Sequence, residues 1–351
     1  MKVRAADFLE YDKENDVYRV SPEQAVRDDV EKHYWLHVVR TIAKDWRLYL
    51  MLVPMLAVFL LWRYLPMYEL LGCFKVEHSV LPVSDQLFSG FSYFRTLLFS
   101  GDGLSTQFWR ALRNTFIISF YGLCFGFPIP IILALFFNEI RSNAARSIYQ
   151  VLTYLPKFMS TVVMTSLVTM LVKQGAQTTN MGVISQAMVN LGLIPYEIGQ
   201  GGLLNQPAFF RSLYEISGIW EGAGYDSIVF FSAIIAISPT SYEAAQIDGA
   251  NKWAQMRYVV LPSILSTIVI MLITRIGGLL NIGYEKVMLL YNTDTYVTAD
   301  VVSTFAYRYG MQNTGQTGLA AAAEMMNNVI GMLLVIGANT IARKASNTSL
   351  Y

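Results

Sequence analysis

The segment from Thr115 to Asn138 carries no charged side chain over its 24 residues. A helix needs about 20 predominantly apolar residues to cross the hydrocarbon core of a bilayer, so this segment is long enough to span a membrane. Five further apolar runs meet the same criterion. The sequence therefore predicts six spans, at about residues 48–72, 114–138, 147–172, 214–238, 262–285 and 319–342.

The placement of charge supports this prediction. Only 15% of the 351 residues are charged, against about 25% in an average soluble domain. Of the 51 charged residues, 19 lie in residues 1–47, which leaves 32 for the other 304. This pattern argues against a soluble enzyme and against a disordered chain. A net charge of +1 gives no field that attracts nucleic acid.

Prolines in or beside the expected spans indicate bent helices in a packed bundle, because a proline within a span removes a backbone donor that neighbouring helices must compensate. These prolines are Pro54, Pro66, Pro128, Pro130 and Pro156. The predicted fold class is all-α, a polytopic membrane helix bundle with about six transmembrane helices. Two cysteines, Cys73 and Cys124, are too few for a disulfide framework. The first apolar run begins near Leu48 after a charged stretch, so we expect it to remain as an anchor.

Orientation follows from the Lys and Arg content of the connecting segments, which is higher on the cytoplasmic side. One set of segments carries ten Lys or Arg in 65 residues, and the other carries eight in 115. The denser set is residues 28–47, 138–148, 239–262 and 342–351. This bias predicts that both termini, including the tail 343–351, are cytoplasmic; an inverted topology is the alternative.

The N-terminal arm divides into two parts. Residues 1–20 have mixed charge, and we expect them to be mobile. Ser21-Pro22-Glu23-Gln24 is typical of a helix start, and an apolar stripe follows at Val26, Val30, Tyr34, Val38, Ile42 and Trp46. Residues 21–47 are therefore predicted to form an amphipathic helix on the inner membrane surface. His33 and His37 lie four residues apart, but no third ligand is near, so we expect a surface pair and no metal site.

Catalytic and nucleotide-binding motifs are absent from the sequence. It contains no GxxxxGK[ST] loop, no HExxH, no CxxC and no GxSxG. Each of these motifs supplies a defined chemistry to ATPases, metalloproteases, redox proteins or hydrolases. We therefore expect a protein that is not an enzyme and binds no cofactor itself.

The connection between the fourth and fifth spans, residues 239–262, is the most informative segment. Thr240 and Glu243 fit a capping box, which predicts a short helix to about Asp248. Gly249 permits a sharp turn, a second helix is expected over 250–260, and Pro262 is expected to start the next span. Two short helices with small side chains form a compact knob that fits a groove in a partner. An ordinary re-entrant loop is the alternative.

This segment resembles the EAA loop of ATP-binding-cassette (ABC) importer permeases. The resemblance rests on Glu243-Ala244-Ala245, on Gly249 and on Val259-Val260-Leu261-Pro262 at the family's spacing. Further segments resemble the polysaccharide-type permeases of the carbohydrate uptake group: 110–139, 283–310, Tyr154-Leu155-Pro156 and Ser349-Leu350-Tyr351. The likeness extends from about residue 45 to 351, so the N-terminal arm lies outside it.

The resemblance implies a permease subunit of an ATP-driven, binding-protein-dependent importer of the bacterial cytoplasmic membrane, with a type I fold and an oligosaccharide or polysaccharide fragment as cargo. The implied partners are a homologous permease, two cytoplasmic ATPase subunits that use ATP and Mg, an extracellular solute-binding protein, the carbohydrate and membrane lipid. The implied mechanism is alternating access. The residues implied in ATPase coupling are Glu243, Ala244, Ala245, Asp248, Gly249, Ala250, Leu261 and Pro262.

Polar side chains inside spans are rare and usually face a pore or a partner. The candidates for a substrate path are Trp220, Glu221, Tyr225, Asp226, Arg275, Asn281, Tyr284, Glu285, Glu324, Asn327 and Asn328. Asn281 and Glu285 are four residues apart, so one helix would place them on one face. A structural bridge between Glu221 and Arg275 is the alternative to a pore role for these two. Glu221 also departs from the family, which more often has a basic residue there.

Three alternative functions differ in what they require. An ABC permease for a non-sugar solute would share the EAA loop. An ion-coupled secondary carrier would transport without ATPase partners and would favour internal repeats, which we do not find in the sequence. A membrane enzyme would need a clustered catalytic set, which we also do not find.

Overall fold

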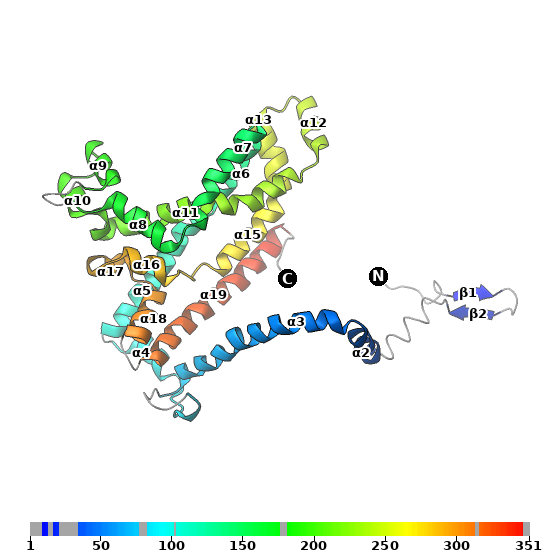
Figure 1. The fold of residues 1–351 in the computed structure, drawn as a ribbon, viewed down its shortest axis with the longest axis horizontal. Coiled ribbons are helices and arrows are strands. Elements are labelled where there is room, and N and C mark those ends of the chain that lie inside the picture. Colours follow the sequence, from blue (N-terminus) through cyan, green and yellow to red (C-terminus); the bar gives the residue numbers. More distant parts are fainter. Residues whose placement is uncertain are drawn as a thin grey trace. The chain divides into compact units, whose positions relative to one another are not determined.

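The computed structural model describes residues 9–12, 17–20, 34–76, 83–101, 103–175, 181–312 and 316–346. The chain divides into two units, Met1–Glu69 and Leu70–Tyr351, and each is described by itself. Figure 1 shows that helices make up almost all of the described chain. The all-α class is therefore confirmed, with one addition in the first unit.

That addition is a short antiparallel hairpin of strands β1 (Leu9–Asp12) and β2 (Val17–Val20), with Leu9 opposite Val20. The sequence analysis did not predict these strands within residues 1–20. Helix α2 (Tyr34–Lys44) lies in the predicted interfacial segment, whereas residues 21–33, including His33, lie outside the described residues. The proposed helix start at Ser21 and the histidine pair therefore stay predictions.

Within the described residues, six stretches overlap the predicted spans. Three are single helices long and apolar enough to cross a membrane: Trp46–Phe74, Gly103–Glu139 and Thr317–Lys344. The first comprises α3 (Trp46–Phe59), η2 (Leu60–Tyr64) and η3 (Leu65–Phe74), the second comprises α5 (Gly103–Tyr121), η5 (Gly122–Gly126) and α6 (Pro128–Glu139), and the third lies in α19 (Thr317–Ser346). Three bent helix pairs bring the possible number of spans to six.

The bent pairs correct two of the predicted spans. The run 147–172 is not one straight helix, because α7 (Asn143–Tyr154) with η6 (Leu155–Phe158) meets α8 (Thr161–Val172) at 102°. Pro156 lies in this corner, and the Ser160 hydroxyl starts the new helix by accepting from the Val163 N–H. The chain leaves the helical conformation at Met159 and Ser160, which both have extended backbone, and the Ser160 cap favours a new helix start at this corner.

The predicted span 262–285 is also interrupted. The helix Lys252–Ser263, which ends with α14 (Leu261–Ser263), meets helix α15 (Leu265–Gly277) at 61°, and Gly278 is the C-cap of α15. Residues 281–283 have no helical structure, and α16 (Tyr284–Leu290) starts a separate helix. Asn281 and Glu285 therefore do not share a helix face, because the Gly277-Gly278 pair favours a break that the spacing argument overlooked.

The remaining spans and connections complete the second unit. The fourth predicted span is α11 (Pro207–Ile235), which is followed by α12 (Pro239–Ile247) after a 70° bend. The other elements are η4 (Val83–Asp85), α4 (Ser92–Phe99), α9 (Val183–Asn190), α10 (Tyr196–Gly201), η7 (Leu203–Asn205), α13 (Lys252–Gln255), η8 (Met256–Val260), η9 (Thr293–Thr295), α17 (Tyr296–Ala299), α18 (Val302–Tyr307) and η10 (Arg308–Gln312).

Helix α11 is central to the packing of this unit. Near its middle it crosses α7 so closely that a Cβ on Gly224 would lie 2.1 Å from the Thr153 carbonyl oxygen. Toward its C-terminus, Phe230, Phe231 and Ile234 pack with Phe137 of α6 in one apolar core. Toward its N-terminus, Phe210 belongs to a second core with residues of α5, α16 and the segment before α18. The space between these two cores contains polar groups.

Candidate functional site

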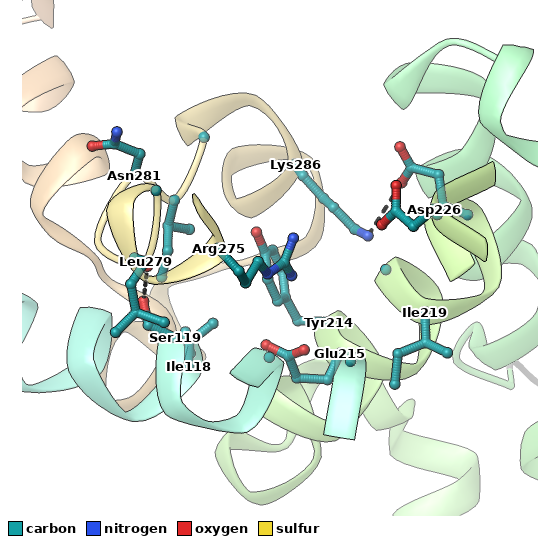
Figure 2. A pocket seen from close by; sticks show the side chains of 18 of the residues that line it. Ile118, Ser119, Tyr214, Glu215, Ile219, Asp226, Arg275, Leu279, Asn281 and Lys286 are labelled. Carbon is teal, nitrogen blue, oxygen red and sulfur yellow. Dashed lines mark hydrogen bonds and ion pairs between the residues drawn. The ribbon is translucent and has the colours of Figure 1, made fainter. Parts of the chain in front are cut away.

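A cavity of about 280 Å³ lies between α5, η5, α11, α15 and the segment that leads into α16. Its charged residues come from four elements of the chain: Glu215, Glu221 and Asp226 from α11, Arg275 from α15, Lys157 from η6 and Lys286 from α16. Figure 2 shows Tyr214, Arg275 and Lys286 together in the middle of this cavity, with Asn281 toward one side. The cavity is therefore strongly polar although apolar cores flank it.

The wall from α11 has a helical repeat. Glu215, Gly218, Gly222 and Asp226 follow one another at intervals of three or four residues and all line the cavity, as expected for one face of a helix. Glycines at 218 and 222 leave the space between the two carboxylates open. The wall from η5 also lacks side-chain bulk, because Gly122 and Gly126 line the cavity there. A Cβ on Gly122 would lie 3.4 Å from the Glu215 carboxylate and 3.7 Å from the Arg275 guanidinium.

The charges in the cavity are only partly paired with one another. Lys286 Nζ lies 3.4 Å from Glu221 Oε2 and 5.1 Å from the centre of the Tyr214 ring. The bridge between Glu221 and Arg275, the alternative to a pore role for these two residues, is not formed in the described structure, because Lys286 occupies the partner position beside Glu221. Within the described part of the chain, Arg275 and Lys157 form no ion pair and no hydrogen bond, so these cations face the cavity without a fixed partner.

The structure brings together part of the predicted substrate path. Glu221, Asp226, Arg275 and Asn281 line the main cavity. Tyr284 and Glu285 line an adjoining hollow that shares Glu221 and Lys286 with it, and the Tyr284 ring stacks on Tyr307 at 5.0 Å. These six positions therefore remain candidates for contact with a ligand.

Five predicted positions lie elsewhere. Trp220 and Tyr225 are exposed on other faces of α11, and the Tyr225 ring meets the edge of Phe158. Asn327 is buried and donates from Nδ2 to the Leu280 carbonyl at 3.0 Å. Neither Glu324, which is half-buried, nor Asn328, which is exposed, lines the described cavities. Within the described residues, these five positions do not line a common cavity.

Among the charged and aromatic residues that line the cavity, the sequence analysis missed four: Lys157, Tyr214, Glu215 and Lys286. For Glu215 a signal was present, because it lies eleven residues before Asp226, three turns away on the same helical face, with Gly218 and Gly222 between them. No such pattern pointed to Lys286, because the predicted fifth span ended at residue 285 and left Lys286 in the external connection that follows. Its position depends on the break after Gly278.

The loop after α11 forms the predicted pair of short helices. Helix α12 begins at Pro239 with Ser238 as its N-cap, and no side-chain capping bond is present. The predicted capping box of Thr240 and Glu243 is therefore wrong: proline at the first helical position sets the start two residues earlier, and the Thr240 hydroxyl bonds to that of Ser238 at 2.7 Å.

The turn after α12 agrees with the sequence. Gly249 has φ +76°, its N–H donates to Gln246 O at 3.0 Å, and the Ala250 N–H donates to Ala245 O at 2.9 Å. These two bonds form a Schellman motif. The next helix starts where Asn251 Oδ1 accepts from the Ala254 N–H. It runs through Pro262 before the bend at Ile264, so Pro262 does not begin the fifth span.

The loop exposes one side and anchors the other. Glu243, Ala244, Asp248, Gly249 and Pro262 are exposed, and Ala245, Ala250 and Leu261 are half-buried. On the inner side, Tyr242 packs against the apolar core that contains Phe137, and burial raises the pKa of its phenol above the usual range. Lys252 Nζ lies 3.3 Å from Glu139 Oε2 of α6. These contacts hold the loop against α6 and leave its other side exposed.

Comparisons with known proteins agree on one family. Residues 126–337 match the family described as binding-protein-dependent transport system inner membrane component. The protein LplB of Bacillus subtilis (strain 168) is 34% identical over 88% of this chain and 92% of its own length. The polygalacturonan/rhamnogalacturonan transport system permease protein YteP of the same organism is 34% identical over 87% of this chain and 90% of its own.

Solved structures extend the likeness to three dimensions. One is a crystal structure of a bacterial ABC transporter involved in the import of the acidic polysaccharide alginate; one of its chains is 38% identical, with a TM-score of 0.75, and the match covers 88% of this chain and 99% of that chain. A second is the bacterial alginate ABC transporter in complex with an alginate pentasaccharide-bound periplasmic protein, with a TM-score of 0.76 at the same identity. The match there covers 89% of this chain and 99% of that chain.

Proposed function

The chain belongs to the family of binding-protein-dependent transport system inner membrane components, and from this premise we propose that it imports an oligosaccharide across the bacterial cytoplasmic membrane. It is the membrane-spanning permease subunit of an ABC importer and not an enzyme. The proposal concerns its cargo, its partners and the residues that carry out transport.

The composition of the cavity carries the cargo proposal. Three cations and three carboxylates surround a space of about 280 Å³, close to the lower end of about 300–1,000 Å³ seen for ligand pockets. A sugar presents hydroxyl groups that both donate and accept, so it can satisfy carboxylates and cationic donors at once. The ring of Tyr214 adds an apolar face beside these groups. Relatives named for polygalacturonan and alginate transport support the same class of cargo.

The proposed mechanism couples this cavity to partner subunits. We call residues 239–262 the coupling loop. Its exposed side, which contains Glu243, Ala244 and Asp248, docks on one of two cytoplasmic ATPase subunits. A homologous permease completes the path, and an extracellular binding protein delivers the cargo. ATP and Mg act in the ATPase subunits, and closure of these subunits moves the coupling loop so that the permease pair alternates between inward-open and outward-open states. Both termini are cytoplasmic in this arrangement.

The test is to purify the assembled importer in mild detergent, identify the oligosaccharide that its binding protein retains, and measure ATP-driven uptake of that sugar in proteoliposomes. We expect the ATPase subunits to co-purify and the R275Q variant to raise the KM for uptake about tenfold, the size of one lost charged hydrogen bond. The R343Q variant, which removes an exposed arginine near the C-terminus, is the control. Uptake driven by a cation gradient in the absence of ATPase subunits would refute the proposal.

A further inference from the structure

The polar face of α11 continues outward beyond the cavity. Arg211 lies four residues before Glu215, on the same helical face as Gly218, Gly222 and Asp226. From Arg211 to Asp226 this face is about 22 Å long at 1.5 Å per residue. Arg211 is at the end of α11 opposite the coupling loop, and on α5 Asn114 lies one turn before Ile118, which lines the cavity.

Two guanidinium groups meet at this outer end. Arg211 donates to Asn114 Oδ1 at 2.9 Å, and Arg113 donates to the same oxygen at 3.4 Å. Arg113 also donates to the Val297 carbonyl at 3.3 Å, and Arg211 to the Thr298 carbonyl at 3.4 Å. We call Arg113 and Arg211 the outer arginine pair. Every acceptor that holds the pair is an uncharged amide oxygen.

The nearest buried carboxylate serves other arginines. Asp300 is fully buried, lies 2.8 Å from Arg308 and 3.6 Å from Arg110, and also accepts from the Thr304 hydroxyl at 2.9 Å. Over the described ranges, neither Arg113 nor Arg211 forms an ion pair. Two like charges that share one neutral oxygen repel each other, and an anion between them would relieve this repulsion.

We propose that the outer arginine pair binds a carboxylate of the cargo, and therefore that the imported oligosaccharide is acidic. This inference rests on the proposed function, because it extends the same path by one helical turn. Arginine is suited to the role, since its planar donors match a carboxylate in bidentate geometry. The pair is preorganised by Asn114, which is itself fully buried and holds α5 to the segment before α18 through the Val297 and Asp300 carbonyls. A chain of several sugars can then contact Arg275 in the cavity and the outer pair together.

The experiment compares two forms of one probe in proteoliposomes that contain the whole importer. Trigalacturonate carries carboxylates, and its methyl ester keeps the ring hydroxyls without the charge. We expect R113Q and R211Q to raise the KM for trigalacturonate about tenfold each, as for a lost charged hydrogen bond, and to leave the KM for the ester unchanged. The R211K variant keeps a charge, and we expect it to restore part of the loss. R95Q, at an exposed position of α4 outside the cavity, is the control.

The outcomes separate this inference from the proposed function. Unchanged kinetics in R113Q and R211Q would overturn the inference. Equal losses for trigalacturonate and its ester would also overturn it, because the pair would then support folding or hold an acidic side chain of the binding protein. Uptake of the ester but not the acid by the wild type would refute acidic cargo and leave oligosaccharide import standing. Uptake of neither probe, nor of any sugar retained by the binding protein, would refute the proposed function itself.

Discussion

Replacement of Gly249 tests whether the shape of the coupling loop drives transport. Gly249 has φ +76° and ends α12 with a Schellman motif. A Cβ at this position meets no atom of the chain within 4 Å, so a substitution introduces no clash. The cost is conformational, about 1–2 kcal/mol for an L-residue held in the left-handed region. That energy changes the population of the turn about 5- to 30-fold, and G249V is expected to lose most ATP-driven uptake.

The assay is uptake in proteoliposomes, with the amount of inserted permease measured in the same membranes. We expect G249V to insert normally, since the turn lies outside the spans. G249N is the matched control, because asparagine adopts the left-handed conformation more readily than valine; it should retain more uptake than G249V. Normal uptake by G249V at wild-type levels of insertion would refute the coupling role of this turn. Equal losses in both variants would show that bulk at the docking surface, and not the backbone conformation, is the cause.

Two further predictions concern stability. D300N leaves the buried end of Arg308 without its counter-ion and should cost about 3–5 kcal/mol, seen as a lower Tm of the complex in detergent, whereas D294N at an exposed site should leave the Tm unchanged; an unchanged Tm in D300N would contradict the assigned network. G224A places a methyl group 2.1 Å from a carbonyl oxygen of α7 and should lower the yield of folded permease, whereas G337A has open space and should not. Equal yields for these two glycine variants would show that the α7–α11 crossing adjusts at little cost.

The sequence predicted features that depend on local patterns. The six apolar runs overlap described helices or bent pairs, because a bilayer requires a minimum hydrophobic length, but the breaks within 147–172 and 262–285 were not predicted. Gly249 was predicted at a turn because glycine adopts a positive φ at little cost. The capping box at Thr240 failed for a local reason as well, since Pro239 is favoured at the first helical position and moved the start of α12.

The cavity was harder to predict because it depends on where helices break. Lys286 reaches Glu221 only because α15 ends at Gly278 and the chain turns before α16. The prediction of one span over 262–285 placed Lys286 outside the membrane, so its contact with Glu221 was not foreseen. Spacing along one helix can show that Glu215 shares a face with Asp226. Contacts between helices depend on tertiary packing, and no simple sequence period predicts them.

The position of α11 suggests how movement of the coupling loop changes the shape of the cavity. One helix carries Glu215, Gly222 and Asp226 on the cavity wall, and α12 begins four residues after its end. Within the cavity wall α11 is held to α7 at Gly224, and between Asp226 and α12 it is held to α6 through the core that contains Phe230. Packed helices move as units rather than deforming continuously, so we infer that displacement of α12 tilts α11 together with α6 and α7. Such a tilt would separate α11 from Arg275 and Lys286, which belong to other helices, and would thereby change the binding of cargo in the cavity.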